Sequence, residues 1–429
     1  MARRLDASDP GFADAFAALI RVRGVRLDEA EGAAREVIAA VRAEGVAAVL
    51  RFAARFDGVS MRAEELRVSA AMRKRARAEC NPELISALEL AAARIAAFHG
   101  RQKPSDAHWT DEEGLALGWR WSPVDSAGLY APGGLAAYPS SVLMNALPAR
   151  AAGVSRLVMT TPPAKLHANP AILAAADIAG VDEIWAIGGA QAIAAMAYGA
   201  GDLAPCDVIV GPGNAYVAAA KKLVFGDVGI DAVAGPSEVF IIADDTAPPA
   251  WLAADLLAQA EHDIDAQAVL FTADSALADT VDAEISRALG AGEAGPCARE
   301  SWARHGAIIR VARAEDAAAW INRAAPEHVQ LALTDPAPLM DAIRHAGAIF
   351  IGAHAPEALG DYIAGPSHVL PTARAARYAS GVSVLTFMKR TTLIAGKRRM
   401  SSIVKIISRS TRPCTTRRCC FGSTSARPA

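Results

Sequence analysis

The spacing of apolar residues divides the chain into two kinds of sequence. Within residues 10–100 apolar side chains recur at helical spacing, as between Ala34 and Val41, which predicts an α-rich start. From about residue 126 short runs of β-branched residues alternate with Ala-rich helical stretches. The predicted strands are Leu157–Thr160, Ile184–Ile187, Val208–Val210, Val239–Ala243, Ala268–Thr272, Ile308–Val311, Val329–Leu333 and Ile349–Ile351. Strands separated by helices indicate an α/β protein with parallel sheets, and eight of them predict two α/β layers.

Turns rich in Gly and Pro lie beside several of these runs. They are Ala131–Gly134, Ile187–Gln191, Gly211–Asn214 and Ala234–Ser237. Doubly wound folds bind ligands at the carboxyl ends of parallel strands, so we expect these turns to form ligand-binding edges. Each turn taken alone is more often a plain tight turn.

The nucleotide-binding signal is indirect. No GxGxxG follows a strand and no GxxxxGK[ST] occurs in the chain, so neither standard phosphate-binding fingerprint is present. Gly188 and Gly189 allow a ligand to approach the backbone, and Gln191 and Asn214 could bond to a ribose or carboxamide near a helix N-terminus. The alternative is a glycine turn followed by polar helix caps.

A candidate metal site begins on one predicted helix. Gln259 and His262 are three positions apart, which places both side chains on the same helix face. An imidazole nitrogen and an amide oxygen can share a divalent metal, although Gln is an uncommon ligand and a polar stripe at a helix end is the alternative. Asp361, in a loop rich in Gly and Pro, would be a third ligand. His368 in the same loop is interpreted as a histidine with its hydrogen bonds satisfied.

Glu327 and His328 form a candidate acid-base pair. They follow Pro326 at the start of a predicted strand, which would send the two side chains to opposite faces. Glu can activate water, and His can carry a proton near neutral pH. The alternative is a polar pair at a strand edge.

The distribution of charge separates the last 39 residues from the rest of the chain. The 429 residues include 44 Lys or Arg and 46 Asp or Glu, and the resulting net charge of −2 argues against a nucleic-acid-binding protein. Residues 391–429 contain nine Lys or Arg and no Asp, Glu or His, so this tail carries +9 and residues 1–390 carry −11. Three of the six Cys also lie in the tail.

Other features bear on location. No secretory signal is evident, and the longest uncharged span, Ser126–Ala149, is interrupted by Pro and Gly, so no membrane helix is expected. Cys80, Cys206 and Cys297 are widely separated and form no CxxC, which favours a reducing cytoplasm.

Taken together, the chain resembles histidinol dehydrogenase, a zinc enzyme that performs the last two oxidations of histidine biosynthesis. The resemblance extends from near the N-terminus to about residue 394. The matching segments are Gly128–Gly134, Ala137–Ala146, Ile187–Gln191, Ile209–Val217, Gly229–Asp231, Ala234–Glu238, Gln259–Asp263, Pro326–His328, Gly360–Tyr362 and His368–Thr372.

The resemblance implies cofactors and ligands. NAD would bind without a standard fingerprint, through Tyr130, Gln191 and Asn214. One Zn²⁺ per subunit would be held by Gln259, His262 and Asp361. The substrate, L-histidinol, would contact these three zinc ligands together with Ser237 and His328.

The same resemblance implies a reaction and a fold. His328 would serve as base, and Glu327 would activate the water that hydrates the aldehyde. The fold would have two incomplete Rossmann-like domains in a homodimer. The implied boundaries are an N-terminal helical segment, 1–25; a first domain, 26–129 with 240–381; a second domain on the NAD side, 130–239; and a tail, 382–429.

The tail departs from the family pattern. In the family a C-terminal helical tail reaches the partner subunit's site and supplies a Glu that contacts substrate and a His that completes the zinc shell. Nothing after Arg390 is Glu, Asp or His in this chain. We hypothesise that the reading frame changes near Ala395 and Gly396, and we expect the altered tail to weaken metal and substrate binding.

Two other functions are also compatible with this sequence. One is a paralogous zinc- and NAD-dependent dehydrogenase that oxidises another polar alcohol, and the other is an inactive NAD-binding member of the family. Association with nucleic acid through the basic tail is disfavoured because Phe421 is the only aromatic residue after residue 397.

Overall fold

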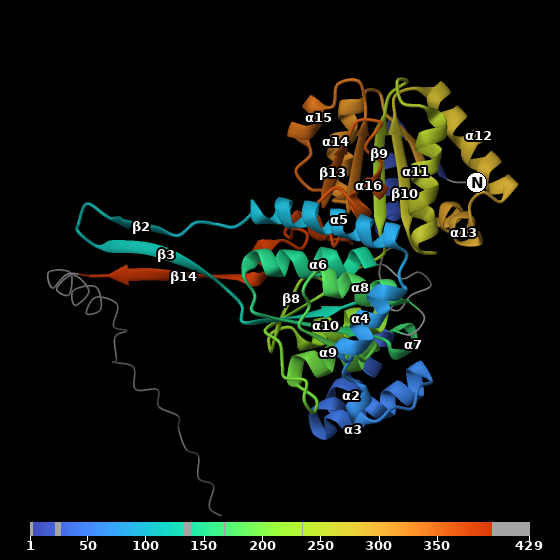
Figure 1. The fold of residues 1–429 in the computed structure, drawn as a ribbon. Coiled ribbons are helices and arrows are strands. Elements are labelled where there is room, and N and C mark those ends of the chain that lie inside the picture. Colours follow the sequence, from blue (N-terminus) through green and yellow to red (C-terminus); the bar gives the residue numbers. More distant parts are fainter. Residues whose placement is uncertain (1–2, 22–26, 133–138, 167–168, 234, 397–429) are drawn as a thin grey trace, which may run out of the picture. The chain divides into compact units, whose positions relative to one another are not determined.

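A computed structural model describes residues 3–21, 27–132, 139–166, 169–233 and 235–396 (Figure 1). The chain divides into two compact units. The first consists of Met1–Lys103 and Pro123–Met388, and it contains every predicted site residue. The second consists of Pro104–Ser122 and the residues from Lys389 onward, of which 389–396 are described. Parts of three matching segments, namely residues 133–134, 137–138 and 234, and the tail from residue 397 lie outside the described residues.

One layer of the first unit is a six-stranded parallel sheet. In spatial order its strands are β1 (Arg3–Asp6), β11 (Ala307–Arg310), β10 (Gln267–Thr272), β9 (Glu238–Ala243), β12 (His328–Ala332) and β13 (Ala348–Ile351). Strand β9 is buried along its whole length, with Val239 and Ile241 in the core on one face and Phe240 and Ile242 in the core on the other. Burial on both faces explains why its sequence is a continuous apolar run.

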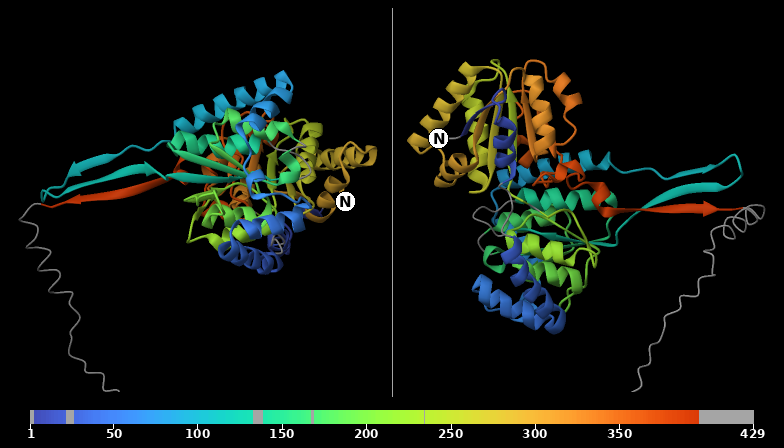
Figure 2. Two further views of the ribbon diagram at one scale, coloured as in Figure 1. Left: turned by 60° about the horizontal axis from the view of Figure 1, so that its bottom comes forward. Right: turned by 180° about the vertical axis from the view of Figure 1, so that it is seen from behind.

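Helices cover both faces of this sheet (Figures 1 and 2). On one face lie α11 (Pro249–His262), α12 (Ser275–Ala291) and α13 (Pro296–His305). On the other lie α1 (Phe12–Arg21), α14 (Ala317–Ala324) and α15 (Ala337–Ala342). Each helix buries an apolar stripe, as α1 does with Phe12, Phe16, Leu19 and Ile20. The sheet is therefore a rigid central layer whose edges can hold a site.

The second layer is a five-stranded parallel sheet. Its strands are, in spatial order, β6 (Glu183–Ala186), β5 (Arg156–Thr161), β4 (Ser126–Tyr130), β7 (Val208–Val210) and β8 (Gly229–Ile230). One face is covered by α2 (Leu27–Glu44), α3 (Val46–Phe52), α9 (Gly189–Tyr198) and α10 (Ala215–Val224), and the other by α4 (Ala70–Glu79), α5 (Pro82–Gly100), α6 (Pro139–Ala152) and α8 (Pro170–Ile178).

The fold class is confirmed: the chain is an α/β protein with two parallel sheets, and all eight predicted strands are present. The resemblance places the helices between residues 27 and 100 in one domain with the six-stranded sheet, whereas in the structure they pack against the five-stranded sheet. Apolar spacing marks the buried stripe of a helix and does not identify the sheet that the stripe covers. Residues 1–25 also contain a strand, β1, before the predicted helix.

The second unit contains a small sheet of order β14-β3-β2, in which β2 and β3 are antiparallel. Its strands are β2 (Ala107–Thr110), β3 (Ala116–Pro123) and β14 (Met388–Ala395). The rings of Trp109 and Trp119 meet edge to face with centroids 5.3 Å apart, and the Arg390 guanidinium lies 5.9 Å from the ring centroids of Trp119 and Trp121. These ring contacts stabilise a sheet in whose strands only Gly118 is buried.

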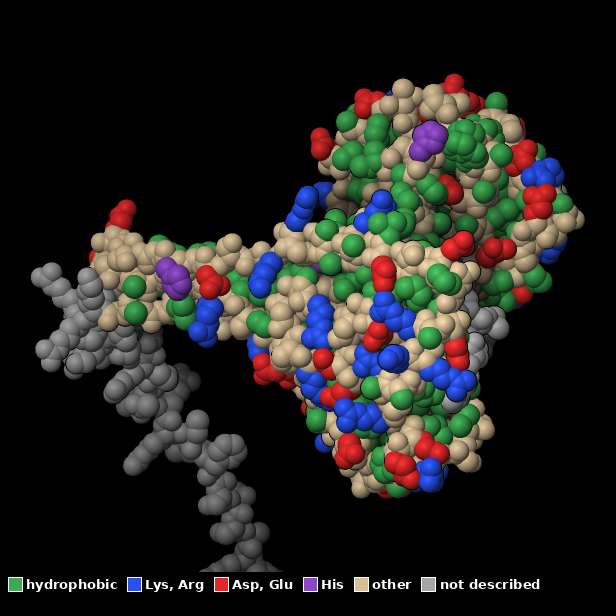
Figure 3. Space-filling view, viewed as in Figure 1, with side chains coloured by type: hydrophobic (Ala, Val, Ile, Leu, Met, Phe, Trp, Pro, Cys, Tyr) green, Lys and Arg blue, Asp and Glu red, His purple; other side chains and the backbone are tan. Residues whose placement is uncertain are grey.

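The surface bears charges of both signs. On the face shown in Figure 3, Lys and Arg lie among Asp and Glu. Ion pairs such as those of Arg77 with Asp177 and Glu89 join surface charges of opposite sign. Within the described parts of the chain, no helix combines the length and the hydropathy that a membrane crossing requires.

Candidate functional site

The predicted substrate residues meet at the amino-terminal edge of the six-stranded sheet. Ser237 directly precedes β9, and His328 is the first residue of β12. Gln259 and His262 lie in the last turn of α11, which runs back from the carboxyl end of β9 to the start of β10. The turn that ends at Ser237 was expected at a carboxyl edge. It lies instead at the amino end of β9, because the chain passes there from β8 of the five-stranded sheet into the six-stranded sheet.

Buried hydrogen bonds join these residues in a network. Ser237 Oγ lies 2.5 Å from Glu327 Oε2, which also accepts a bond of 3.2 Å from the backbone N–H of Glu238. The orientation of the Gln259 amide that satisfies both its ends places its oxygen 3.2 Å from Ser237 Oγ and its nitrogen 3.0 and 3.2 Å from the two carboxylate oxygens of Glu357. All four side chains of this network are less than 9% exposed, so its geometry is shielded from water.

Glu327 is a carboxyl group in an apolar setting. Burial raises its pKa to about 8, while the hydrogen bond with Ser237 acts in the opposite direction. At neutral pH the group therefore holds its proton, and a carboxylic acid can donate to Ser237 Oγ while the Ser237 hydroxyl donates to Gln259. Burial likewise raises the pKa of Glu357 to about 7, against the charge of His328.

His328 is held in one tautomer. Its Nδ1 lies 3.0 Å from the main-chain carbonyl oxygen of Glu238, so Nδ1 carries the proton and donates it to that oxygen. Nε2 is then unprotonated and can accept a proton. Glu327 Oε2 and Glu357 Oε1 lie 3.7 and 3.6 Å from Nδ1, and both would stabilise a protonated ring.

Glu327 and His328 do not point to opposite faces, as strand alternation predicted. The strand β12 begins at His328, so Glu327 lies outside it and is free to turn toward the same edge. The two side chains are therefore close enough to act on one substrate.

A cavity of about 240 Å³ opens beside His328. It is also lined by Asp361, His368 and Phe350, and the rings of His328 and Phe350 have centroids 5.9 Å apart. The wall is mostly apolar and contains a few polar side chains, a composition typical of small-molecule sites.

Asp361 belongs to α16 (Glu357–Tyr362), one turn after Glu357. His368 Nδ1 lies 3.0 Å from the carbonyl oxygen of Asp361, and His368 Nε2 lies 3.2 Å from Ser141 Oγ. Both ring nitrogens thus have partners, as expected for His368. Burial lowers the pKa of His368, and the nearby Asp361 acts in the opposite direction. The charge of the exposed His262 lowers this pKa further.

The predicted metal ligands, Gln259, His262 and Asp361, are chemically suited to zinc. An imidazole nitrogen, a carboxylate and an amide oxygen are all accepted ligands. In the described part of the chain no three His, Cys, Asp or Glu side chains gather as a metal-binding group, so a zinc site with three protein ligands here would need the Gln259 amide.

The predicted cofactor residues lie at the carboxyl edge of the five-stranded sheet. Tyr130 ends β4, Gln191 is in the first turn of α9 after β6, and Asn214 follows β7. Because β4, β6 and β7 belong to one parallel sheet, their carboxyl ends share an edge. This arrangement matches the ligand-binding edge of doubly wound folds.

Each of these three side chains already has a partner. The Tyr130 hydroxyl accepts a 3.1 Å bond from Gly189 N, and burial raises the pKa of Tyr130 to about 12. Gln191 Nε2 donates to Asp57 at 3.5 Å. The Asn214 oxygen caps α10 by accepting from Tyr216 N and Val217 N, both at 3.1 Å. The cap uses only the oxygen, so the amide nitrogen of Asn214 can serve a ligand.

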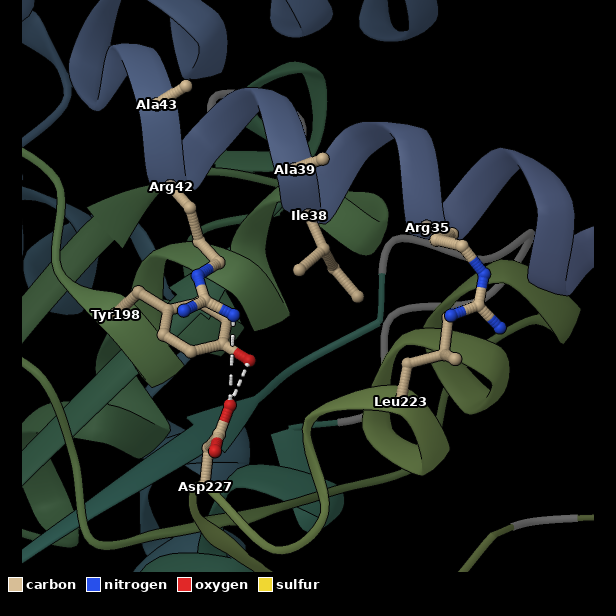
Figure 4. A pocket seen from close by; sticks show the side chains of 8 residues that line it. All are labelled: Arg35, Ile38, Ala39, Arg42, Ala43, Tyr198, Leu223 and Asp227. Carbon is tan, nitrogen blue, oxygen red and sulfur yellow. Dashed lines mark hydrogen bonds and ion pairs between the residues drawn. The ribbon is translucent and has the colours of Figure 1, made fainter. Parts of the chain in front are cut away.

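A larger hollow, of about 510 Å³, lies between α2 and the outer ends of α9 and α10 (Figure 4). Arg42 stacks on the ring of Tyr198, and the hydroxyl of Tyr198 donates to Asp227 at 2.7 Å. None of the predicted site residues lines this hollow. Arg42, Tyr198 and Asp227 are paired with one another, which gives no reason to place the active site there.

Several residues of the network were not predicted from the sequence. Glu357 contacts Gln259 and His328, Asp57 contacts Gln191, and Ser141 contacts His368. Asp57 and Glu357 are isolated acids in loop-like sequence. The signal that could have identified Ser141 is its place in the segment Ala137–Ala146.

Comparison with known proteins gives a consistent answer. The family model for histidinol dehydrogenase matches residues 21–411. The histidinol dehydrogenase of Caulobacter vibrioides is 52% identical over 392 residues, 91% of each chain, and that of Rhodospirillum rubrum is 54% identical over 395 residues, 92% of this chain and 91% of the relative.

A solved structure agrees with the sequence comparisons. The crystal structure of histidinol dehydrogenase from Elizabethkingia anophelis superimposes with a TM-score of 0.88 at 33% identity and covers 95% of this chain and 94% of its own. On the family match and on these relatives, the chain belongs to the histidinol dehydrogenase family.

Proposed function

We propose that the chain oxidises L-histidinol to L-histidinaldehyde and then to L-histidine, passing one hydride to NAD in each step. The observation that carries this proposal is the network around His328: an imidazole fixed in one tautomer beside a carboxyl group whose pKa is raised to about 8. A two-step oxidation needs a base for the alcohol proton and a base for the water that hydrates the aldehyde.

His328 is the base for the alcohol. Its Nδ1–H is committed to the Glu238 carbonyl, so Nε2 accepts the hydroxyl proton as the hydride leaves. The positive charge that develops on the ring is stabilised by Glu357, whose Oε1 lies 3.6 Å from Nδ1, and by Glu327 Oε2, at 3.7 Å, in the molecules in which that carboxyl group is ionised. In the second step His328 takes the proton of the hydrated aldehyde in the same way.

Glu327 activates the water for that hydrate. Its ionised form is needed for this role, and the bonds from Ser237 and from the backbone N–H of Glu238 stabilise that form. Ser237 also contacts the substrate. The aldehyde stays bound between the two steps, which prevents its loss to solvent.

Zinc would be held by Gln259, His262 and Asp361 and would orient the substrate by binding its polar groups. Glu357 fixes the Gln259 amide nitrogen, so the amide oxygen is directed away from Glu357. NAD would be bound by Tyr130, Gln191 and Asn214 at the edge of the five-stranded sheet. Cys80, Cys206 and Cys297 are free thiols, which supports a cytoplasmic location.

The proposed reaction is tested by its stoichiometry. With L-histidinol as the limiting reagent and NAD in excess, we expect two NADH per histidinol, measured by absorbance with added Zn²⁺. A yield of one NADH would restrict the chain to alcohol oxidation. Turnover of another polar alcohol in preference to histidinol would identify a paralogous dehydrogenase, and NADH binding without turnover would identify an inactive relative.

The tail bears on zinc binding and on the homodimer that we propose. In a dimer of this family the tail would supply the fourth zinc ligand to the partner subunit's site, and this chain has no His or acid after residue 390. Three protein ligands leave a tetrahedral zinc shell incomplete. We therefore propose that the tail is read in a shifted frame and that this chain binds zinc less tightly than its relatives.

We expect the purified chain to contain well under one zinc per subunit after dialysis. Translation of the gene in the other two frames beyond codon 394 should yield an apolar-periodic helix with a Glu and a following His. A chain rebuilt with that tail should retain about one zinc, as measured by atomic absorption. Full zinc retention by the unaltered chain would contradict this part of the proposal.

A further inference from the structure

Gly211 is the residue at which β7 ends and the turn toward α10 begins, and side chains bind both of its backbone polar groups. Its N–H donates to Asp231 Oδ2 at 2.9 Å, and its carbonyl oxygen accepts from Lys221 Nζ at 2.9 Å. Lys221 Nζ also forms an ion pair with Asp231 Oδ1. One lysine and one aspartate therefore hold both backbone polar groups of a single residue.

The ion pair is deeply buried and its members come from separate elements. The side chains of Lys221 and Asp231 are 3% and 4% exposed. Lys221 lies two turns into α10, while Asp231 directly follows β8, the edge strand that pairs with β7. Lys and Asp are rarely buried in their charged forms, because removing a charge from water costs free energy. The bonds to Gly211 indicate the structural role that this buried pair has.

The turn that they hold lies against a predicted cofactor residue. Gly211 has φ +116°, and a Cβ at this position would lie 2.3 Å from the carbonyl oxygen of Tyr130. At Gly213 a Cβ would lie 2.4 Å from Val217 Cγ1, in the first turn of α10. The turn is thus packed too closely for side chains, and a small displacement of Gly211 would move both Tyr130 and Asn214.

We propose that the buried Lys221–Asp231 pair positions the Gly211–Asn214 turn to receive the dinucleotide, so that both are positioning residues for NAD binding. The inference rests on the proposed function, which assigns Tyr130 and Asn214 to NAD. Lys221 does not act as a phosphate ligand, because its ammonium group is buried and bound to Gly211 and Asp231. The pair acts through the backbone of the turn.

The test is NADH binding, followed by fluorescence titration, because it needs no turnover. Replacing both residues together, Lys221→Met with Asp231→Leu, removes the two bonds to Gly211 and leaves no unpaired charge in the core. We expect the Kd for NADH to rise about tenfold or more, since a displaced binding group loses much of its contact. Zinc content should not change, because the zinc residues lie on the other sheet.

A second ion pair, which is partly buried, provides the matched control. Arg156 and Glu183 are 2.6 Å apart with side chains 24% and 16% exposed, and they lie at the amino ends of β5 and β6, opposite the cofactor edge. Arg156→Met with Glu183→Leu should lower the melting temperature by a similar amount and leave the Kd for NADH unchanged. An equal loss of NADH affinity in the control would overturn the inference, because the effect would then be one of stability.

Two further outcomes are decisive. If the apolar pair does not fold, Lys221→Arg retains the charge but cannot place one ammonium between Gly211 and Asp231, and the Kd for NADH should rise several-fold. An unchanged Kd in either folded variant would overturn the positioning role. Failure of the unaltered chain to bind NADH would overturn the proposed function and this inference with it.

Discussion

Replacement of His328 by Asn is expected to lower kcat for histidinol oxidation about 1000-fold, within the range measured for loss of a general base. The Asn side chain is short and polar, and its amide N–H can still donate to the Glu238 carbonyl as His328 Nδ1 does. It has no group in the place of Nε2 that can accept the alcohol proton. The loss should therefore appear in kcat for both steps, while the Kd for NADH stays unchanged.

The control for this variant is His345→Asn, since His345 lies in the turn before β13 and lines neither cavity. Its kcat should equal that of the unaltered chain. Both variants are assayed with saturating Zn²⁺ so that metal loss does not limit the rate. A His328→Asn variant with more than about a tenth of the original kcat would show that another group accepts the alcohol proton.

The strands that could be predicted share one property. The eight predicted runs are apolar because both faces of each sheet are covered by helices, so the strand sequence carries a strong signal. Strand β1 is Arg3–Asp6 and pairs only with β11 at the sheet edge, where charged residues are tolerated. Strand β8 has two residues. Strand β1 is therefore too polar, and β8 too short, to be recognised from a run of apolar residues.

The site residues could be predicted only where neighbouring residues in the sequence restrict the local backbone structure. Pro326 before Glu327 and His328 indicated a strand start, and Asn214 in a Gly and Pro turn indicated a cap or a ligand; both interpretations agree with the contacts. Glu357 could not be found in this way. Its role depends on α16 lying beside the last turn of α11, about a hundred residues earlier, and no periodicity encodes such a contact.

Sequence alone also left open how a charged pair is used. Lys221 is one of two adjacent lysines in α10, and a helix surface would be the ordinary place for both. The structure buries Lys221 against Asp231 and leaves Lys222 half exposed with Glu31 as its partner. Whether a lysine is a surface charge or a positioning residue depends on its burial. Burial is set by the tertiary structure, so the local sequence cannot show it.

The pH dependence of the second oxidation is expected to follow Glu327. Burial raises the pKa of this carboxyl to about 8, so below pH 8 most molecules hold the proton and lack the base that activates water. The rate of histidinaldehyde oxidation should rise about tenfold per pH unit between pH 6 and 7.5 and level off above pH 8. Glu327→Gln, which has the same shape and no ionisable group, should lose this rise and be slower by about 100-fold or more at pH 9.

The same carboxyl gives a stability readout that is independent of activity. Between its unfolded pKa near 4.5 and its folded pKa of about 8, the folded state binds a proton that the unfolded state has released, so stability falls as pH rises through this interval. At 1.36 kcal/mol per pKa unit the loss is at most about 5 kcal/mol. Urea unfolding from pH 5 to 9 should show this decline in the unaltered chain and a smaller one in Glu327→Gln.

The matched control is Glu315→Gln, which removes an exposed carboxyl group in the short helix after the carboxyl end of β11. It should leave both the pH–rate profile and the decline in stability unchanged. A rate for Glu327→Gln that still rises with pH would assign the water-activating role to another group, of which Glu357 is the nearest candidate. Burial raises the pKa of Glu357 to about 7 only, so a profile due to Glu357 would level off one pH unit lower. The position of the plateau therefore distinguishes the two carboxyl groups even before a second variant is made.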